Sequence, residues 1–181
     1  MNKPAVPVAP GILAVPIFAP GEAALIAAFL SLATAWRPAG INAEQIVDRR
    51  VRDAEILDAE AQPALLHRVR ERVAIATVDL AAQLAPAAVL AELQLVRYRT
   101  GGTYVEHRDR PACDAAPRSL SIVGYLNDDF TGGATVFPEL SVTVRPQAGK
   151  AIVFAPDLLH RADPILQGCK YAITAWYHTI R

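Results

Sequence analysis

Hydrophobic residues follow a helical period in the first half of the chain. Between residues 21 and 36, and again between about 63 and 84, apolar side chains recur every three or four positions, as in a helix buried on one side. Proline and glycine bound both segments, and Glu22 suits the first turn of the earlier one. The later segment presents a broad apolar face formed by Leu65, Leu66, Val69, Val73, Ile75 and Val78.

The pattern changes to short alternating runs from about residue 93 onward. These runs are separated by Gly, Pro and Asp, and they predict strands at 93–99, 104–108, 120–126, 135–137, 141–145, 151–155 and 172–179. Earlier in the chain we expect an edge strand near residues 11–17 and a strand near 51–56. Helices followed by strands predict an α+β fold, a jelly roll with the N-terminal helices on one face.

The length of 181 residues predicts one domain, with residues 1–90 as a mainly helical scaffold and 91–181 as the jelly-roll core. Eighteen basic and eighteen acidic side chains cancel, which argues against a nucleic-acid or anionic-membrane partner. The longest apolar run, residues 23–30, is too short to span a bilayer. Cys113 and Cys169 are interpreted as free thiols, so we expect a cytoplasmic protein.

Candidate metal ligands lie in the strand-rich half. On a strand, His107 and Asp109 would point to the same side, and 50 residues of strand-forming sequence allow the chain to return to them at His160. Two imidazoles and one carboxylate form the facial triad that binds divalent iron with coordination positions left open. Taken alone, a His-x-Asp pair is more often a surface ion pair, and a single His is more often structural.

Lys170 is a candidate anchor for a carboxylate of a cosubstrate. An anion deep in a barrel needs a cation, and counting by twos from Lys170 puts Ala172, Thr174, Trp176 and His178 on the same face. Tyr98, Tyr104 and Tyr125 add phenol groups that can hold a carboxylate. The alternatives are a surface lysine ahead of a core strand and ordinary half-buried aromatic residues.

Several ordered motifs give the chain a family resemblance. They are the run from Tyr98 through Gly102 and Tyr104 to His107-x-Asp109, then Tyr125-Leu126-Asn127, the segment 132–139, the His160–Lys170 pair and the segment 170–177. Over roughly residues 93–179 the chain resembles the Fe(II)- and 2-oxoglutarate-dependent dioxygenases of the prolyl 4-hydroxylase type. The animal oxygen sensors of this family carry Arg where this chain has Lys170, whereas collagen-type and many microbial relatives carry Lys.

The resemblance implies a role for each candidate residue. His107, Asp109 and His160 would bind Fe(II), and Lys170 with Tyr125 would hold the distal carboxylate of 2-oxoglutarate. Tyr98 and Thr174 would line the cosubstrate pocket, and Tyr104 and Trp176 would lie nearer the substrate. Dioxygen is the second cosubstrate, and ascorbate is a candidate reductant. Gly132 and Gly133 resemble a turn that needs positive φ angles.

The expected activity is hydroxylation of peptidyl proline, coupled to oxidative decarboxylation of 2-oxoglutarate. The alternatives are an oxygenase of a free amino acid or small metabolite, a non-catalytic jelly-roll binding module, and a metal-binding domain of the cupin type. The loop at 110–117 is a candidate for substrate contact. His67 is expected on the surface, His178 away from the metal depth, and Cys169 in a packing role facing away from Lys170.

Overall fold

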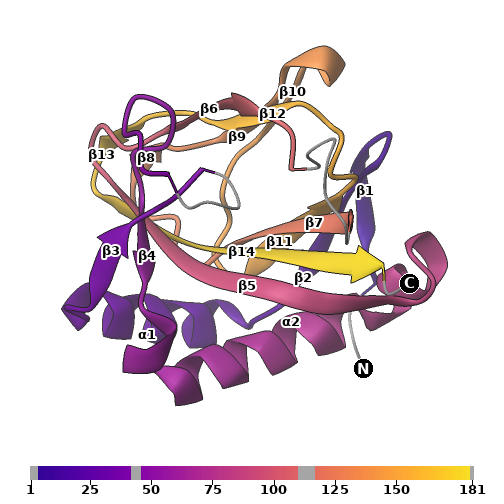
Figure 1. Ribbon diagram of the computed structural model, residues 1–181, viewed down its shortest axis with the longest axis horizontal. Coiled ribbons are helices and arrows are strands. Elements are labelled where there is room, and N and C mark those ends of the chain that lie inside the picture. Colours follow the sequence, from indigo (N-terminus) through magenta and orange to yellow (C-terminus); the bar gives the residue numbers. More distant parts are fainter. Residues whose placement is uncertain (1–3, 42–45, 110–116, 180–181) are drawn as a thin grey trace.

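The alternating segments of the C-terminal half form β-strands, and two sheets face each other at the centre of the molecule (Figure 1). The computed structural model describes residues 4–41, 46–109 and 117–179. In spatial order, the large sheet consists of β1 (Val6–Ala9), β2 (Ile12–Pro16), β11 (Lys150–Phe154), β7 (Arg118–Tyr125), β14 (Cys169–Thr179), β5 (Ala88–Arg99), β4 (Glu55–Leu57) and β3 (Trp36–Pro38).

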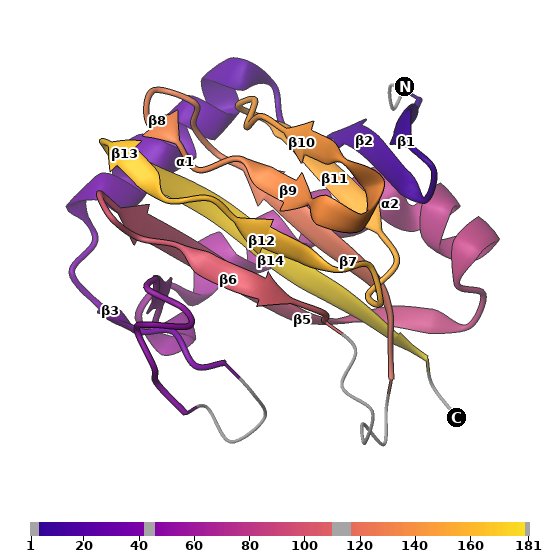
Figure 2. The same ribbon diagram turned by 90° about the horizontal axis from the view of Figure 1, so that it is seen from above.

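The smaller sheet lies over the large one (Figure 2). Its strands are β10 (Val142–Val144), β9 (Thr135–Phe137), β12 (His160–Ala162) and β6 (Tyr104–His107). The short strands β13 (Ile165–Gln167) and β8 (Thr131–Gly132) pair at one end. Strands distant in sequence alternate within the large sheet, with β14 antiparallel to both β5 and β7. This arrangement confirms the predicted jelly roll, here a double-stranded β-helix.

Helices α1 (Pro20–Leu32) and α2 (Pro63–Leu84) both cover the outer side of the large sheet (Figure 1). Strand alternation sends Leu93 and Leu95 of β5, with Ile173 and Ala175 of β14, into one buried cluster with residues of both helices. The opposite face of the same two strands therefore remains available to line the space between the sheets.

Helix α1 begins at Pro20, with a proline at its first position, and ends four residues earlier than the pattern predicted. Ala33 is already extended, and Trp36 belongs to β3, where it pairs with Leu57 of β4. The indole of Trp36 also packs near the ring of Tyr171, with ring centroids 6.2 Å apart. Sheet pairing and tertiary packing thus override the helical period at this end.

Helix α2 has the predicted bounds but a narrower buried face. Its buried residues are Val69, Val73, Thr77 and Ala81, each four positions from the next. The prediction for Ile75 and Val78 was wrong, because 52% and 54% of these residues are exposed. A helix lying on a sheet buries a single stripe, and both residues fall outside it.

The N-terminal half contributes more strand than the sequence suggested. Within residues 4–41 and 46–87, four strands accompany the two helices, and all four extend the large sheet. The edge strand is β1, and the segment predicted at the edge forms β2 inside it. The strand predicted at 51–56 is confined to β4, while β5 and β14 begin earlier than expected, at Ala88 and Cys169. In the part of the chain described, neither helix has the length and apolar composition needed to cross a bilayer.

A matched pair of substitutions on α2 tests which stripe supports the sheet. We expect Val73→Ala to lower the free energy of unfolding by about 2 kcal/mol, because it removes two fully buried methyl groups under the sheet. The exposed Val78→Ala should change it by less than about 0.5 kcal/mol. Urea denaturation followed by circular dichroism measures both. Equal losses in the two variants would show that the buried stripe is misplaced.

Candidate active site

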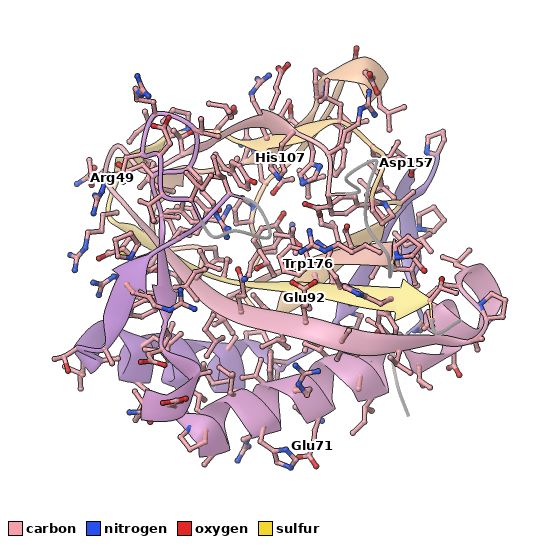
Figure 3. All side chains as sticks on the ribbon, in the orientation of Figure 1. Arg49, Glu71, Glu92, His107, Asp157 and Trp176 are labelled. Atoms are coloured by element: carbon pink, nitrogen blue, oxygen red, sulfur yellow. The ribbon has the colours of Figure 1, made fainter. Side chains whose placement is uncertain are left out.

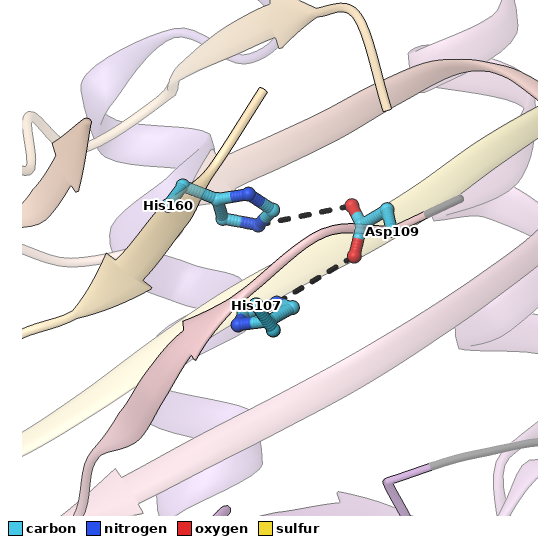
Figure 4. A group of neighbouring side chains, drawn as sticks. All are labelled: His107, Asp109 and His160. Atoms are coloured by element: carbon cyan, nitrogen blue, oxygen red, sulfur yellow. Dashed lines mark ion pairs between the residues drawn. The ribbon is translucent and has the colours of Figure 1, made fainter. Parts of the chain in front are cut away.

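The three predicted metal ligands converge between the two sheets. His107 is the last residue of β6 and His160 the first of β12, and the antiparallel register places these two residues directly opposite each other. Asp109 follows β6 by two residues, and its backbone N–H donates to the carbonyl oxygen of Pro156, 2.8 Å away. One ligand atom of each residue lies within 4.8 Å of the others (Figure 4).

Both imidazoles are oriented with Nε2 toward the carboxylate. Nε2 of His107 lies 3.6 Å from Oδ1 of Asp109, and Nε2 of His160 lies 3.8 Å from Oδ2 (Figure 4). In each ring Nδ1 contacts a backbone carbonyl two residues earlier, that of Val105 at 2.8 Å and that of Leu158 at 2.9 Å. A carbonyl only accepts, so Nδ1 carries the proton and Nε2 presents a lone pair.

The protonation states suit a divalent cation. Burial by itself would raise the pKa of Asp109, but the neighbouring imidazoles of His107 and His160 and the indole of Trp176 outweigh it and hold that pKa well below its usual value. Burial lowers the pKa of His160. Both shifts favour the forms that metal binding requires, an ionised carboxylate at Asp109 and a neutral imidazole at His160, because protonated ligands cannot coordinate.

Neighbouring side chains fix the ligands in place. The indole Nε1 of Trp176 donates to Oδ2 of Asp109 at 2.9 Å. Figure 3 shows Trp176 on the large sheet and His107 on the opposite one. The ring of Tyr104 stacks on that of His107 with centroids 3.5 Å apart, and Phe154 packs edge-on against His160. Such outer contacts restrict the ligand rotamers before a metal arrives.

A cavity of about 640 Å³ joins the triad to Lys170. It is lined by the three ligands and by Tyr98, Tyr104, Lys170, Thr174 and Trp176 from the predicted set. The alternate residues of β14 predicted to share a face, from Lys170 through His178, all line it. Tyr125 is absent from the lining: it is buried, and its hydroxyl lies 2.9 Å from Oγ1 of Thr135, which does line the cavity.

Lys170 is buried, with 1% of the residue exposed. Its Nζ donates to the carbonyl oxygen of Gly133 at 2.7 Å and lies 5.4 Å and 5.3 Å from the ring centroids of Tyr98 and Tyr125. Among the described residues no carboxylate forms an ion pair with it. Burial lowers the pKa of Lys170 to about 7. A bound anion would therefore stabilise the charged form of Lys170, which has no ion-pair partner among the described residues.

The phenols near Lys170 remain neutral donors. Burial raises the pKa of Tyr98 and Tyr125, and it raises that of Tyr104 to about 12. Gly133 gives this end its shape: φ is +65°, and a Cβ would lie 2.4 Å from Cδ1 of Ile165. Gly132 also has a positive φ, so the predicted backbone angles are confirmed, but Gly132 belongs to β8 and pairs with Ile165 instead of forming a turn.

The remaining sequence predictions have mixed outcomes. His67 is exposed and pairs with Glu71 on α2, and Cys169 packs at the edge of the helix-side core, both as expected. His178 lines the cavity, with Nε2 2.8 Å from Oε1 of Glu92, and lies outside the ligand cluster. Asp109 follows β6 and is not part of the strand. Residues 110–116 of the predicted substrate loop, and Cys113 with them, lie outside the described residues.

Sequence reasoning missed several polar residues of the cavity. They are Arg52, Glu92, Gln94, Arg118 and Thr135. Glu92 and Gln94 alternate with Leu93 and Leu95 along β5, so the period of two could have placed them opposite the core. Arg118 pairs with Glu92 at 2.9 Å and lies 4.0 Å from the ring centroid of Trp176. No such alternation could have placed the side chain of Arg52, because this residue follows a turn and lies outside any regular strand.

Comparisons with solved structures support the fold. The viral collagen prolyl hydroxylase of Paramecium Bursaria Chlorella virus-1 superposes with a TM-score of 0.70 and 18% identity, over 94% of this chain and 97% of that one. A Pseudomonas putida prolyl-4-hydroxylase gives a TM-score of 0.65 with 23% identity, over 94% and 93% of the two chains. At these identities the similarity concerns the fold alone.

Sequence comparisons find similar proteins for the C-terminal half of the chain. Prolyl 4-hydroxylase subunit alpha-2 of Gallus gallus is 34% identical over 103 residues, and subunit alpha-1 of Homo sapiens is 34% identical over 106, each alignment covering 48% of this chain. They cover 19% and 20% of those proteins, so the chain spans less than half the length of the curated relatives it matches. The sequence model of the 2OG-Fe(II) oxygenase superfamily matches residues 93–178. Over these residues the chain is therefore similar in sequence to the 2OG-Fe(II) oxygenase superfamily and to the prolyl 4-hydroxylases.

Proposed function

We propose that this chain is an Fe(II)- and 2-oxoglutarate-dependent hydroxylase that acts on proline. One observation carries the proposal: the only described cluster of two imidazoles and a carboxylate opens into the same cavity as a buried lysine that has no acidic partner among the described residues. The triad would bind a metal ion, and the lysine would bind the carboxylate of a dicarboxylate cosubstrate that does not bind the metal.

His107, Asp109 and His160 would hold the iron. When bound together, Fe(II), 2-oxoglutarate and dioxygen supply the oxidative chemistry that inserts an oxygen atom into a C–H bond. The chain's own contribution is orientation. Nδ1 of each histidine is fixed by a backbone carbonyl, and the indole of Trp176 holds Asp109, so the three side chains that would bind the iron are held at the cavity wall.

Lys170 would bind the distal carboxylate of 2-oxoglutarate. Tyr98 and Tyr125 flank its ammonium, and their neutral phenols would complete the anion site as hydrogen-bond donors. Thr174 lies between Lys170 and Trp176 on the same face of β14 and would line the cosubstrate channel. Because the pocket is buried, the charge pair would be strong only after water is displaced.

Tyr104 and Trp176 would lie on the substrate side of the metal. Both line the cavity, and each also contacts a metal ligand, Tyr104 by stacking on His107 and Trp176 by hydrogen bonding to Asp109. We expect both side chains to pack against the proline ring of the substrate and also to hold His107 and Asp109 in position.

The substrate class rests on relatives. Those named above are prolyl hydroxylases, and a solved prolyl hydroxylase from Trichoplax adhaerens is in complex with a hypoxia inducible factor peptide fragment, with 18% identity to this chain. A free amino acid is the second candidate, because a cavity of about 640 Å³ is in the range that holds small molecules. The complete triad counts against a non-catalytic module.

We also propose a cytoplasmic location and ascorbate as the reductant.

The activity test is a coupled assay on the chain supplied with Fe(II), 2-oxoglutarate and proline-containing substrates. We expect one succinate for each oxygen added, detected by mass spectrometry. Asp109→Ala should abolish iron binding and turnover, because the remaining two imidazoles cannot neutralise the cation.

The matched control is Glu139→Ala, which removes a half-exposed carboxylate that pairs with Arg108. This variant should keep iron binding and activity. Circular dichroism should show a folded domain in both variants. Full activity in Asp109→Ala would contradict the proposed metal site.

A second prediction concerns the cosubstrate anchor. Lys170→Ala should weaken 2-oxoglutarate binding on the order of 100-fold or more, because the distal carboxylate would be buried without a cation. Lys150→Ala, at an exposed lysine on β11, is the control and should leave binding unchanged. Calorimetric titration of the metal-loaded protein measures both. An unchanged affinity in Lys170→Ala would mean that another cation binds the cosubstrate.

A third prediction follows from the lowered pKa of Lys170, about 7 in the free protein. Below this pH the ammonium is already charged, so 2-oxoglutarate affinity should be level. Above it, binding must take up a proton, and the affinity should fall by up to about tenfold per pH unit. Lys170→Arg keeps its charge at every pH in this range and should remove the decline. A decline of the same slope in Lys170→Arg would assign it to another group.

A further inference from the structure

Arg52 is a second buried cation in the cavity, and the proposed mechanism does not use it. Only 6% of this residue is exposed, and it lines the same cavity as the triad. Its Nη1 donates to the carbonyl oxygen of Gly40 at 2.8 Å, and Nη2 lies 3.4 Å from Oε1 of Gln94. The guanidinium lies 5.0 Å from the ring centroid of Tyr104. Its Nε is buried and has no hydrogen-bond partner.

The other arginines of the cavity are each paired with a carboxylate. The pairs are Arg108 with Glu139 at 2.6 Å, Arg118 with Glu92 at 2.9 Å, and Arg161 with Glu106 at 2.9 Å and Asp163 at 2.8 Å. Arg52 forms no ion pair with any carboxylate of residues 4–41, 46–109 and 117–179. Its charge is therefore the one arginine charge of the described cavity that lacks an acidic partner.

Arg97 shows what this chain does with a buried arginine of purely structural role. It is 8% exposed and lies 4.4 Å from the ring centroid of Trp36, much as Arg52 lies against Tyr104. However, Arg97 pairs with Glu55 at 2.7 Å. A buried guanidinium without such a partner carries a desolvation cost that a ligand anion would remove. The comparison separates Arg52 from the structural arginines of the fold.

We propose that Arg52 binds the carboxylate of the substrate, so that the target proline carries its own free α-carboxylate. Such a proline is either the free amino acid or the last residue of a peptide. This inference rests on the proposed function, in which Lys170 is occupied by the distal carboxylate of 2-oxoglutarate. A guanidinium is suited to the planar carboxylate because its N–H groups form a fork.

The position of Arg52 fits this role. Its backbone bridges to Tyr104, and its side chain reaches Gln94 on β5, which pairs with Thr174 on β14. Tyr104 in turn stacks on the metal ligand His107. Arg52 thus lies beside residues that surround the triad, and its contact with Tyr104 is on the side where we place the substrate. A proline ring held by its carboxylate at Arg52 would pack against Tyr104.

The test compares carboxylates with their uncharged amides. Calorimetric titrations of the protein loaded with Mn²⁺ and 2-oxoglutarate use L-proline against L-prolinamide, and acetyl-Gly-Pro against its C-terminal amide. We expect the wild type to bind one or both carboxylates roughly 10- to 100-fold more tightly than the matching amide, which is the effect of one charged hydrogen-bonded pair. Preference for L-proline assigns a free amino acid, and preference for the dipeptide assigns a chain terminus.

Variants separate recognition from structure. Arg52→Gln should reduce the carboxylate-to-amide ratio to near one and leave the affinity for 2-oxoglutarate within about twofold. Arg52→Lys, which keeps the charge and loses the fork, should retain part of the ratio. Arg97→Gln, the matched control at a paired arginine, should leave the ratio unchanged. The ratio is measured within each variant, so partial loss of folded protein does not alter it.

Three results would overturn the assignment. The first is a wild-type ratio near one, or no binding of any carboxylate probe. In the second, Arg52→Gln weakens carboxylate and amide equally, which means that Arg52 only ties Gly40 to β5. In the third, Arg52→Gln weakens 2-oxoglutarate binding and leaves the ratio intact, which assigns Arg52 to the cosubstrate. None of these results alters the outcome for Asp109 or Lys170, whose tests stand separately.

Discussion

The antiparallel pairing of β6 with β12 is the interaction on which the site depends. It brings together two histidines that are 53 positions apart in the sequence and sets His107 opposite His160. Asp109 completes the cluster only because the chain leaves β6 and bonds to Pro156, in the segment that leads into β12. If this register slipped by one residue, a histidine would turn away from the space between the sheets and the cluster would be lost.

The large sheet supplies the complementary half of the site. Along β14 one face packs on the helices, while the other carries Lys170, Thr174 and Trp176 toward the triad. Helices α1 and α2 contribute no residue to the cavity lining, but they cover the outer side of the strands that carry the lining residues. Burial lowers the pKa of Lys170 to about 7, so a bound anion would favour its charged form.

Residue patterns predicted most of the fold and most of the site. The period of two identified the core strands and correctly grouped the alternate residues from Lys170 to His178 on one face. The helical period located α2 to the residue, but it overextended α1 into Trp36, whose pairing with Leu57 depends on a segment 21 positions away. It also assigned Ile75 and Val78 to a buried face, since the apolar pattern does not reveal how wide a stripe the sheet will cover.

The missed residues share a physical cause. Arg52 lies in an irregular segment, so no period predicts where its side chain points, and only tertiary contact with Gly40 and Tyr104 brings it into the cavity. Tyr125 lies outside the cavity lining, with its hydroxyl 2.9 Å from Oγ1 of Thr135, so its part in the anion site stays a prediction. Contacts of this kind depend on distances between strands, which a one-dimensional pattern does not contain.

We propose that one metal ion and one dicarboxylate occupy the cavity together, between the triad and Lys170. A crystal structure of the chain with Mn²⁺ and 2-oxoglutarate under anaerobic conditions tests it most directly. We expect one ion coordinated by His107, Asp109 and His160, with the distal carboxylate of the bound 2-oxoglutarate on Nζ of Lys170. An ion bound by other residues, or a 2-oxoglutarate carboxylate far from Lys170, would contradict it.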